Sequence, residues 1–194
     1  MSHETDNPWQ TRASKVVYDN PWIRVREDQV IRPDGAPGIY GVVHFKHIAI
    51  GILPVADGHV YLVGQYRYTL GRYSWEIPEG GCPADEDPLS AASRELAEET
   101  GLRAGRWQKM GAAHLSNSVT DELAIWFLAT ELTQGEHKPE GTERLCVRRV
   151  SLADAGQMLL RGEITDAISV MALMQYQLEQ TRLAGRPADG SREA

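Results

Sequence analysis

Hydrophobic and polar positions alternate along the first third of the chain, and this pattern predicts strands. The expected strands are rich in valine, isoleucine and aromatic residues and cover residues 15–18, 22–31, 38–45, 48–55 and 59–68. Turn-forming residues separate them, and Asp57-Gly58 between the last two favours a type I′ hairpin. We therefore expect an N-terminal β-rich subdomain over residues 14–45, followed by a larger domain over residues 46–184.

The middle of the chain changes to a helical period. Asp87 is a good N-cap, Pro88 occupies the first helical position, and Gly101 can end the helix. The apolar positions that fall on one face at helical spacing are Leu89, Ala92 and Leu96. These signals together predict a helix between Asp87 and Gly101.

The rest of the chain continues with strands and then helices. Further strands are expected at residues 107–112, 123–132 and 145–150, and helices at 152–160 and 166–183. A β-rich start followed by helix, strands and two helices indicates an α/β fold with helices on both faces of a mixed sheet. The polar segments 1–13 and 185–194 are expected to be a flexible N-terminus and a disordered tail.

Composition and charge narrow the function. The 194 residues are 42% hydrophobic and 24% charged, which is ordinary for a soluble globular protein. The net charge of −7 disfavours nucleic acid binding through a basic face, so an anionic substrate would need bound cations. No apolar run approaches the roughly 18 residues that span a membrane, and no secretory signal is visible, so we expect a cytoplasmic protein.

Three glutamates gather on one side of the predicted helix. Glu95, Glu98 and Glu99 lie at i, i+3 and i+4, which places their β-carbons about 5–6 Å apart. Like charges so placed repel, and a hard divalent cation such as Mg²⁺, which prefers oxygen ligands, would relieve the repulsion. A solvated acidic face is the alternative. Gly80 and Gly81 precede the helix and allow the backbone to approach a ligand closely.

These residues carry a resemblance to a known family. The stretch Gly80–x5–Glu86–x7–Arg94–Glu95–Leu96–x–Glu98–Glu99–x–Gly101–Leu102 resembles the Nudix box at every fixed position. The resemblance implies the Nudix fold, an α/β/α sandwich around a mixed sheet, with the box forming a metal-binding loop–helix–loop. It also implies Mg²⁺ as the cofactor, with Mn²⁺ as a substitute.

The same resemblance implies roles for individual residues. Glu95 and Glu99 match the family's direct metal ligands, Glu98 lies beside them, and the carbonyl of Glu79 is a further ligand. The remaining fixed positions are structural and comprise the pair Glu86 and Arg94 and the helix-ending Gly101.

The flanking segments resemble the ADP-ribose pyrophosphatase, or nucleoside diphosphate sugar hydrolase, branch of the family. The resemblance rests on Gln65–Tyr68, on Trp75–Gly81 and on the β-rich N-terminal segment, which in that branch is exchanged across a homodimer. Arg67 matches an arginine that contacts a substrate phosphate, although a strand-end arginine also pairs readily with a carboxylate.

Several positions near these segments stay open. Trp75 is either a core residue or a wall of the substrate cleft, beside Gly80 and Gly81. Trp22 and Tyr40 fit packing better than base stacking. Asn117 stands where the branch has the proline of a Ser-Pro-Gly-like turn, which questions a strict specificity for ADP-ribose.

The general base is expected on a loop rather than in the box. The resemblance implies a glutamate late in the chain, and the loop Gln134–Arg144 contains Glu136, Glu140 and Glu143. We prefer Glu140 and then Glu143 as the catalytic base.

The expected function is Mg²⁺-dependent hydrolysis of the diphosphate linkage of a nucleoside diphosphate sugar, such as ADP-ribose. The products are a nucleoside monophosphate and a sugar phosphate. The first alternative is a house-cleaning nucleoside triphosphate pyrophosphohydrolase, a class that is usually shorter and lacks the N-terminal β segment. The second is a non-catalytic nucleotide-binding module, which the retention of all the box glutamates disfavours.

Overall fold

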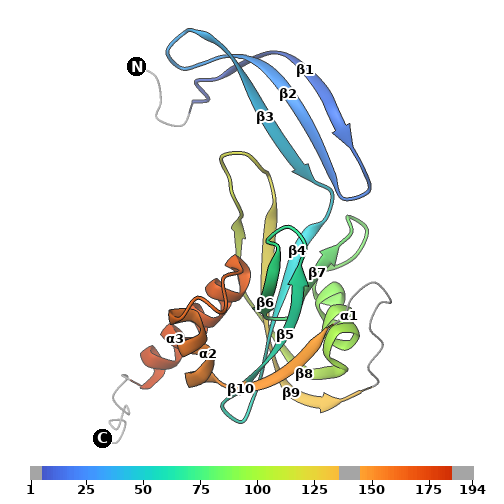
Figure 1. Cartoon of the computed structure of the whole chain (residues 1–194), viewed down its shortest axis with the longest axis vertical. Helices are drawn as coiled ribbons and strands as arrows, with labels where there is room; N and C mark the ends of the chain where they lie inside the picture. The colour runs from blue at the N-terminus through green and yellow to red at the C-terminus, as the bar shows by residue number, and fades with distance from the viewer. Residues whose placement is uncertain (1–5, 136–144, 185–194) are drawn as a thin grey trace, which may run out of the picture.

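Two sheets divide the molecule, and Figure 1 shows the smaller one standing apart from the larger. The structure is a computed structural model that describes residues 6–135 and 145–184. The smaller sheet is antiparallel and contains β1 (Gln10–Asp19), β2 (Ile23–Ile31) and β3 (Pro37–Phe45). Because β1 begins at Gln10, residues 10–13 extend the expected strand and are not part of a loose N-terminus.

The larger sheet has seven strands and mixed pairing. Its main path runs in the order β10 (Cys146–Ser151), β5 (His59–Arg67), β4 (Ile48–Ala56), β9 (Leu123–Gln134) and β8 (Leu102–His114). Two short strands extend it, because β6 (Arg72–Glu76) pairs with β5 and β7 (Glu79–Cys82) pairs with β4. Only β4 and β9 run parallel among the described pairs, so the expected mixed sheet is confirmed.

Helices cover both faces of this sheet, as Figure 1 shows. Helix α1 (Pro88–Thr100) packs on one face, and α2 (Leu152–Leu160) and α3 (Ala167–Ala184) pack on the other. The fold is therefore the α/β/α sandwich that the sequence predicted. Within the described ranges, no helix combines the length and apolar character that crossing a membrane requires.

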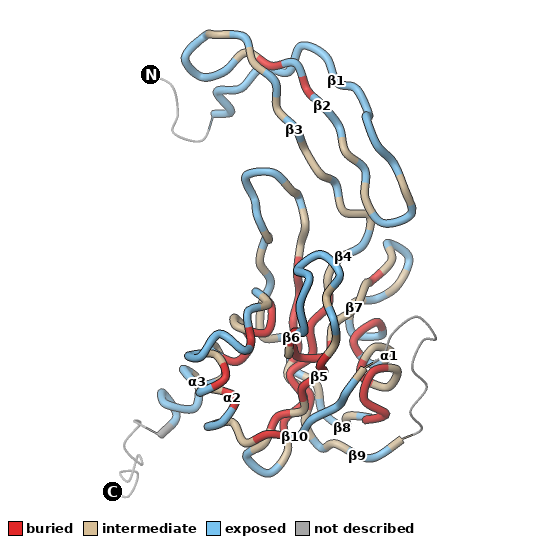
Figure 2. The backbone as a smooth tube through the Cα atoms, viewed as in Figure 1, coloured by how far each residue is buried: buried red, intermediate tan, exposed pale blue. Residues whose placement is uncertain are grey.

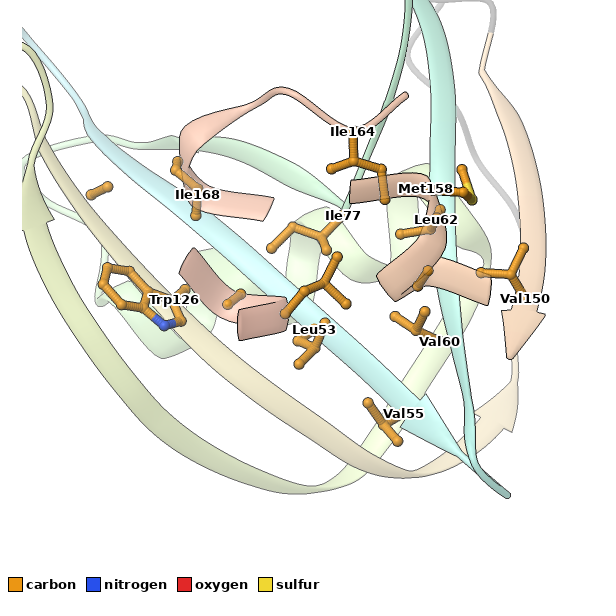
Figure 3. Packing of buried hydrophobic residues seen from close by; sticks show 14 residues of the cluster. Leu53, Val55, Val60, Leu62, Ile77, Trp126, Val150, Met158, Ile164 and Ile168 are labelled. Atoms are coloured by element: carbon orange, nitrogen blue, oxygen red, sulfur yellow. The ribbon is translucent and has the colours of Figure 1, made fainter. Parts of the chain in front are cut away.

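Strand β4 lies at the centre of the core and is buried on both faces. Successive side chains of a strand point to opposite faces, so Ile50 and Ile52 pack with Leu96 of α1, whereas Leu53 and Val55 pack toward α2 and α3. Figure 3 shows the second cluster, and Figure 2 shows that the buried residues concentrate in this sandwich. A continuous apolar run, rather than an alternating one, is what a doubly covered strand requires.

The small sheet buries little of its own surface. Asp28 and Val30 are its buried residues among the three strands, and most of the sheet is exposed in Figure 2. Asp28 accepts hydrogen bonds from Ser14 Oγ and from Arg26 Nε, and these bonds hold the pKa of its carboxyl below the usual range. Packing alone therefore does not explain the stability of this sheet as an isolated element.

The small sheet is joined to the sandwich through the loop that follows β8. The backbone N–H of Val43 in β3 donates to the carbonyl of Val119 at 2.8 Å, and Tyr40 Oη donates to the carbonyl of Ser118 at 2.6 Å. Asp121 accepts from the backbone N–H of Phe45 at 3.0 Å. The loop that carries Asn117 in the sequence thus runs beside β3.

Local signals in the sequence are reproduced where the chain turns. Asp57 and Gly58 both have positive φ angles, 50° and 70°, which is the type I′ geometry predicted for the β4–β5 hairpin. Leu89 departs from its predicted place, since 41% of it is exposed. It lies in the first turn of α1, whereas Ala92 and Leu96, which share its predicted face, are fully buried.

Candidate active site

The acidic edge of α1, which consists of Glu95, Glu98 and Glu99, faces β7 across a hollow of about 270 Å³. The residues around it that the sequence predicted for the site are Glu79, Gly80, Gly81, Arg94, Glu95, Glu98 and Glu99. The structure therefore brings the predicted metal-binding glutamates and the preceding glycine strand to one place.

The position of the acidic edge follows from how α1 begins and ends. The Asp87 carboxylate accepts the backbone N–H groups of Leu89 and Ser90, with Pro88 at the first helical position. Gly101 ends the helix with a φ of 70°, a left-handed conformation that favours glycine. Ala92 and Leu96 are fully buried where the helix packs on the sheet, which fixes its rotation, and the neighbouring glutamates line the hollow beside β7.

Arg94 ties the loop, the strand and the helix together. Its Nε and Nη2 donate to the two carboxylate oxygens of Glu86 at 3.1 and 2.8 Å, and Nη2 also donates to the carbonyl of Gly81 at 3.0 Å. Its Nη1 donates to Glu95 at 2.6 Å and to Glu98 at 3.1 Å. These bonds hold the pKa of Glu86 below its usual value. Glu86 and Arg94, to which the resemblance assigns a structural role, are thus hydrogen-bonded to each other.

Glycine at position 80 leaves the space that Glu95 occupies. A β-carbon built at Gly80 would lie 1.9 Å from Glu95 Cδ, much closer than any real contact. At the adjacent Gly81, a β-carbon would lie 3.2 Å from His47 Nδ1. The two glycines thus allow the strand to approach both the acidic edge of the helix and a histidine on the opposite wall.

The donor set fits a hard divalent cation. Glu95, Glu98 and Glu99 supply carboxylate oxygens, and the Glu79 carbonyl is a neutral oxygen donor of the kind that Mg²⁺ and Mn²⁺ accept. In the part of the chain that the structure describes, no three acidic, histidine or cysteine side chains already converge as a metal cage. The Arg94 guanidinium lies between Glu95 and Glu98 instead, so a cation binding there would replace its Nη1 hydrogen bonds.

Glu79 directs its side chain away from α1 and toward α3. Ser169 Oγ donates to Glu79 Oε1 at 3.1 Å, while the backbone N–H of Glu79 donates to Glu99 Oε2 at 2.9 Å. Loss of contact with water raises the pKa of the Glu79 carboxyl well above its usual value, and the neighbouring Asp166 raises this pKa further. The carbonyl of Glu79 is therefore the group that suits a role as ligand.

A second hollow of about 370 Å³ adjoins the first and contains Arg67. Gly80 and Gly81 line both hollows, and Glu122 lines the second. Arg67 Nε donates to both oxygens of the buried Glu76, at 3.0 and 2.9 Å, and this pairing raises the pKa of the arginine. Arg67 is therefore paired with a carboxylate that is buried, and it also lines a cavity; its contact with a substrate phosphate stays a prediction.

Trp75 lies elsewhere. Its ring packs against the core cluster beneath α2 and α3, edge-on to Tyr73, with the Arg148 guanidinium 5.6 Å from the ring centroid. It does not line either of the two hollows described above. The structure thus places Trp75 in the packing position rather than on the wall of the cleft.

Two residues near the site were not identified as site residues from the sequence. Trp22, which the sequence favoured as packing, is 66% exposed and lines both hollows, and His47 lines both as well. The backbone N–H of Lys46 donates to the Trp22 carbonyl at 2.9 Å, which brings the β1–β2 turn to the start of β4. Sequence spacing carries no signal of this approach, because it depends on how the two sheets meet. Glu140 and Glu143 lie outside the described residues.

Comparison with known proteins extends the resemblance beyond the motif to most of the chain. The family model of the NUDIX domain matches residues 45–173, and that of the nucleoside diphosphate sugar hydrolase N-terminal domain matches residues 9–43. The chain is 32% identical to an ADP-ribose pyrophosphatase of Mycobacterium tuberculosis, covering 95% of this chain and 91% of that protein. It is 34% identical to an ADP-ribose pyrophosphatase of Bacillus subtilis, covering 88% and 94%.

A solved structure shares the fold. The crystal structure of an ADP compounds hydrolase superposes with a TM-score of 0.83 and 21% identity, covering 95% of this chain and all of that chain. The predicted fold is thereby confirmed. With the box residues gathered at one hollow and the family match spanning most of the sandwich, the chain belongs to the Nudix family and is a Nudix hydrolase.

Proposed function

We propose that this Nudix hydrolase cleaves the diphosphate linkage of a nucleoside diphosphate sugar, with ADP-ribose as the first candidate. The products are a nucleoside monophosphate and a sugar phosphate. The observation that carries the proposal is the adjacency of two hollows, one with the glutamates of α1 and one with Arg67, joined along Gly80 and Gly81. The names of the two bacterial relatives and the match of the N-terminal segment support the same substrate class.

The carboxylates and the arginine divide the work on the substrate. Glu95 and Glu99, with Glu98 beside them and the Glu79 carbonyl opposite, would hold Mg²⁺, or Mn²⁺ in its place. Bound there, the cation neutralises phosphate charge and lowers the pKa of a bound water. Arg67 keeps its Nη1 without a hydrogen bond to the described residues, and a guanidinium edge suits a phosphate oxygen.

The general base would come from the segment Gln134–Arg144, with Glu140 preferred and then Glu143. Glu140→Gln and Glu143→Gln, compared with Glu136→Gln from the same segment, identify it. We expect Glu140→Gln to lower kcat by at least about 100-fold, the contribution typical of general base catalysis, with Glu136→Gln unchanged. A kcat equal to that of the wild type in all three variants would contradict a base in this segment.

The exposed apolar residues of the small sheet support a homodimer. Val16, Val17, Tyr18 and Ile39 are each more than half exposed. Exposed apolar surface of this kind is characteristic of an interface, and a second copy of the chain is the partner that the branch resemblance implies. We also propose that the protein is cytoplasmic.

A substrate panel tests the proposed reaction. The protein is incubated with Mg²⁺ and nucleotide sugars, dinucleotides or nucleoside triphosphates, and the products are identified by mass. We expect cleavage of nucleotide sugars into two monophosphates. Release of pyrophosphate from triphosphates alone would instead assign the chain to the house-cleaning class. Comparison of the kcat/KM for ADP-ribose with that for other nucleoside diphosphate sugars also shows whether a chain with Asn117 has a broader specificity.

A further inference from the structure

Helix α3 is connected to the acidic edge of α1 by hydrogen bonds that pass through Glu79. The backbone N–H of Ile77 donates to Ser169 Oγ at 2.9 Å, and the Ser169 hydroxyl donates to Glu79 Oε1 at 3.1 Å. The backbone N–H of Glu79 then donates to Glu99 Oε2 at 2.9 Å. Ser169 is fully buried, so no water competes for its hydroxyl. The series of bonds ends on a carboxylate of the box.

The segment between Ile77 and Glu79 depends on these bonds because of the proline between them. Pro78 has no N–H group, so Ile77 and Glu79 supply the two backbone donors around it. One is bound by Ser169 and the other by Glu99. The Pro78 carbonyl accepts from the backbone N–H of Ile52 in β4 at 2.9 Å. The direction of the next carbonyl, that of Glu79, is therefore set by contacts to three elements.

Ser169 itself is held firmly. Its backbone N–H donates to Asp166 Oδ2 at 2.8 Å, which caps the first turn of α3. The preceding Ile168 packs so closely on β4 that a β-carbon at Gly51 would lie 2.5 Å from its Cγ2. Figure 3 shows Ile168 and Ile77 in the same core cluster. The hydroxyl is thus presented to β7 from a rigid helix start.

We propose that Ser169 is a positioning residue of the metal site, which orients the Glu79 carbonyl and the Glu99 carboxylate through its bonds to Ile77 and Glu79. The inference rests on the proposed function, since it assigns these two groups to the cation. Groups that orient metal ligands from behind typically change metal affinity by about 10–100-fold when removed. Ser169 therefore acts on metal binding without touching metal or substrate.

Mn²⁺ binding to the full chain without nucleotide tests this role. Free Mn²⁺ is counted by electron paramagnetic resonance for the wild type, Ser169→Ala and Ser169→Thr. We expect Ser169→Ala to raise the Kd for Mn²⁺ about tenfold and Ser169→Thr, which keeps the hydroxyl, to recover most of the affinity. Ser74→Ala is the matched control, because Ser74 is also buried and its hydroxyl has no hydrogen-bond partner among the described residues. Its Kd should equal that of the wild type.

The outcomes separate the two proposals. Absence of Mn²⁺ binding in the wild type overturns the proposed metal site, and this inference with it. Wild-type binding together with a Kd for Ser169→Ala within twofold of the wild type overturns the role of Ser169 alone. Should Ser169→Ala fail to fold, Glu79→Ala breaks the same hydroxyl–carboxylate link from the strand side. A Kd within twofold of the wild type for that variant would equally overturn the role of Ser169.

Discussion

At the scale of single residues, the site depends on the missing side chain of Gly80 and on the buried carboxylate of Glu99. Gly80 has no side chain, and Glu95 fills the space that one would occupy. Glu99 is 95% buried, and its carboxylate accepts a hydrogen bond from the backbone N–H of Glu79 in β7. Both features hold a glutamate carboxylate against β7. The spacing of the glutamates in the sequence predicts only that they share one side of the helix.

Gly80→Ala is expected to damage the site without unfolding the protein. The added β-carbon would displace the Glu95 carboxylate, and misplacement of a catalytic group by about 1 Å can cost about 100-fold in rate. We expect that loss in kcat/KM, measured at saturating Mg²⁺. Gly41→Ala is the matched control, since a β-carbon there meets nothing within 4 Å. Equal activity of the two variants would contradict this geometry.

Glu99→Gln is expected to lower kcat by several orders of magnitude while leaving the melting temperature nearly unchanged. Glutamine keeps an oxygen for the Glu79 N–H but loses the charge that a cation requires. Glu98→Gln should lose less, because Glu98 lies more openly and its hydrogen bond is to Arg94. Steady-state kinetics over a range of Mg²⁺ concentrations measures both. Turnover by Glu99→Gln at the wild-type rate would remove the box from the mechanism.

At the scale of elements, predictability depended on how local each signal is. Helix α1 was predicted between Asp87 and Gly101 because capping residues and apolar spacing lie within the helix itself. Strands β6 and β7 were not predicted, since they are short and β7 contains two glycines; their pairing with β5 and β4 is what makes them strands. The hydrogen bonds of Ser169 were not predicted either, because Ser169 lies 90 residues or more from Ile77 and Glu79 in the sequence.

The loop before α1 should contribute stability in a pH-dependent way. Hydrogen bonds from Arg94 hold the pKa of Glu86 below its usual value, so the native state favours the ionised form. A carboxyl with a depressed native pKa stabilises the fold above its unfolded pKa, and this contribution is lost as the pH falls through the native pKa. Glu86→Gln should therefore melt below the wild type at pH 7, with the gap closing below pH 4.5. A gap that persists unchanged at the lower pH would contradict this pairing.

At the scale of the whole molecule, the sandwich was predictable and the approach of the small sheet to it was not. The alternation of elements and the box resemblance together gave the fold that the comparisons confirm. The placement of Trp22 and His47 beside the glutamates depends on contacts between β3 and the loop after β8, such as Val43 to Val119. No local pattern encodes such contacts. The roles of the individual site residues stay predictions.

Charge placed on the exposed sheet should dissociate a dimer. Val16 and Val17 are adjacent in β1 at a register shift in its pairing with β2, and each is 52% exposed. The double variant Val16→Glu/Val17→Glu places two carboxylates among the exposed apolar residues of the proposed interface. Sedimentation velocity should show a dimer for the wild type and a monomer for this variant. Leu160→Glu, on the exposed side of α2, should remain dimeric. A monomeric wild type would contradict the proposed interface.

The central claim is that the acidic edge of α1 holds a divalent cation against a diphosphate. The most direct measurement is anomalous diffraction from crystals soaked with Mn²⁺ and a non-hydrolysable α,β-methylene analogue of ADP-ribose. We predict a manganese peak bound by Glu95, Glu99 and the Glu79 carbonyl, with a phosphate oxygen of the analogue completing its coordination. Crystals with the analogue bound and no manganese at these residues would contradict the claim.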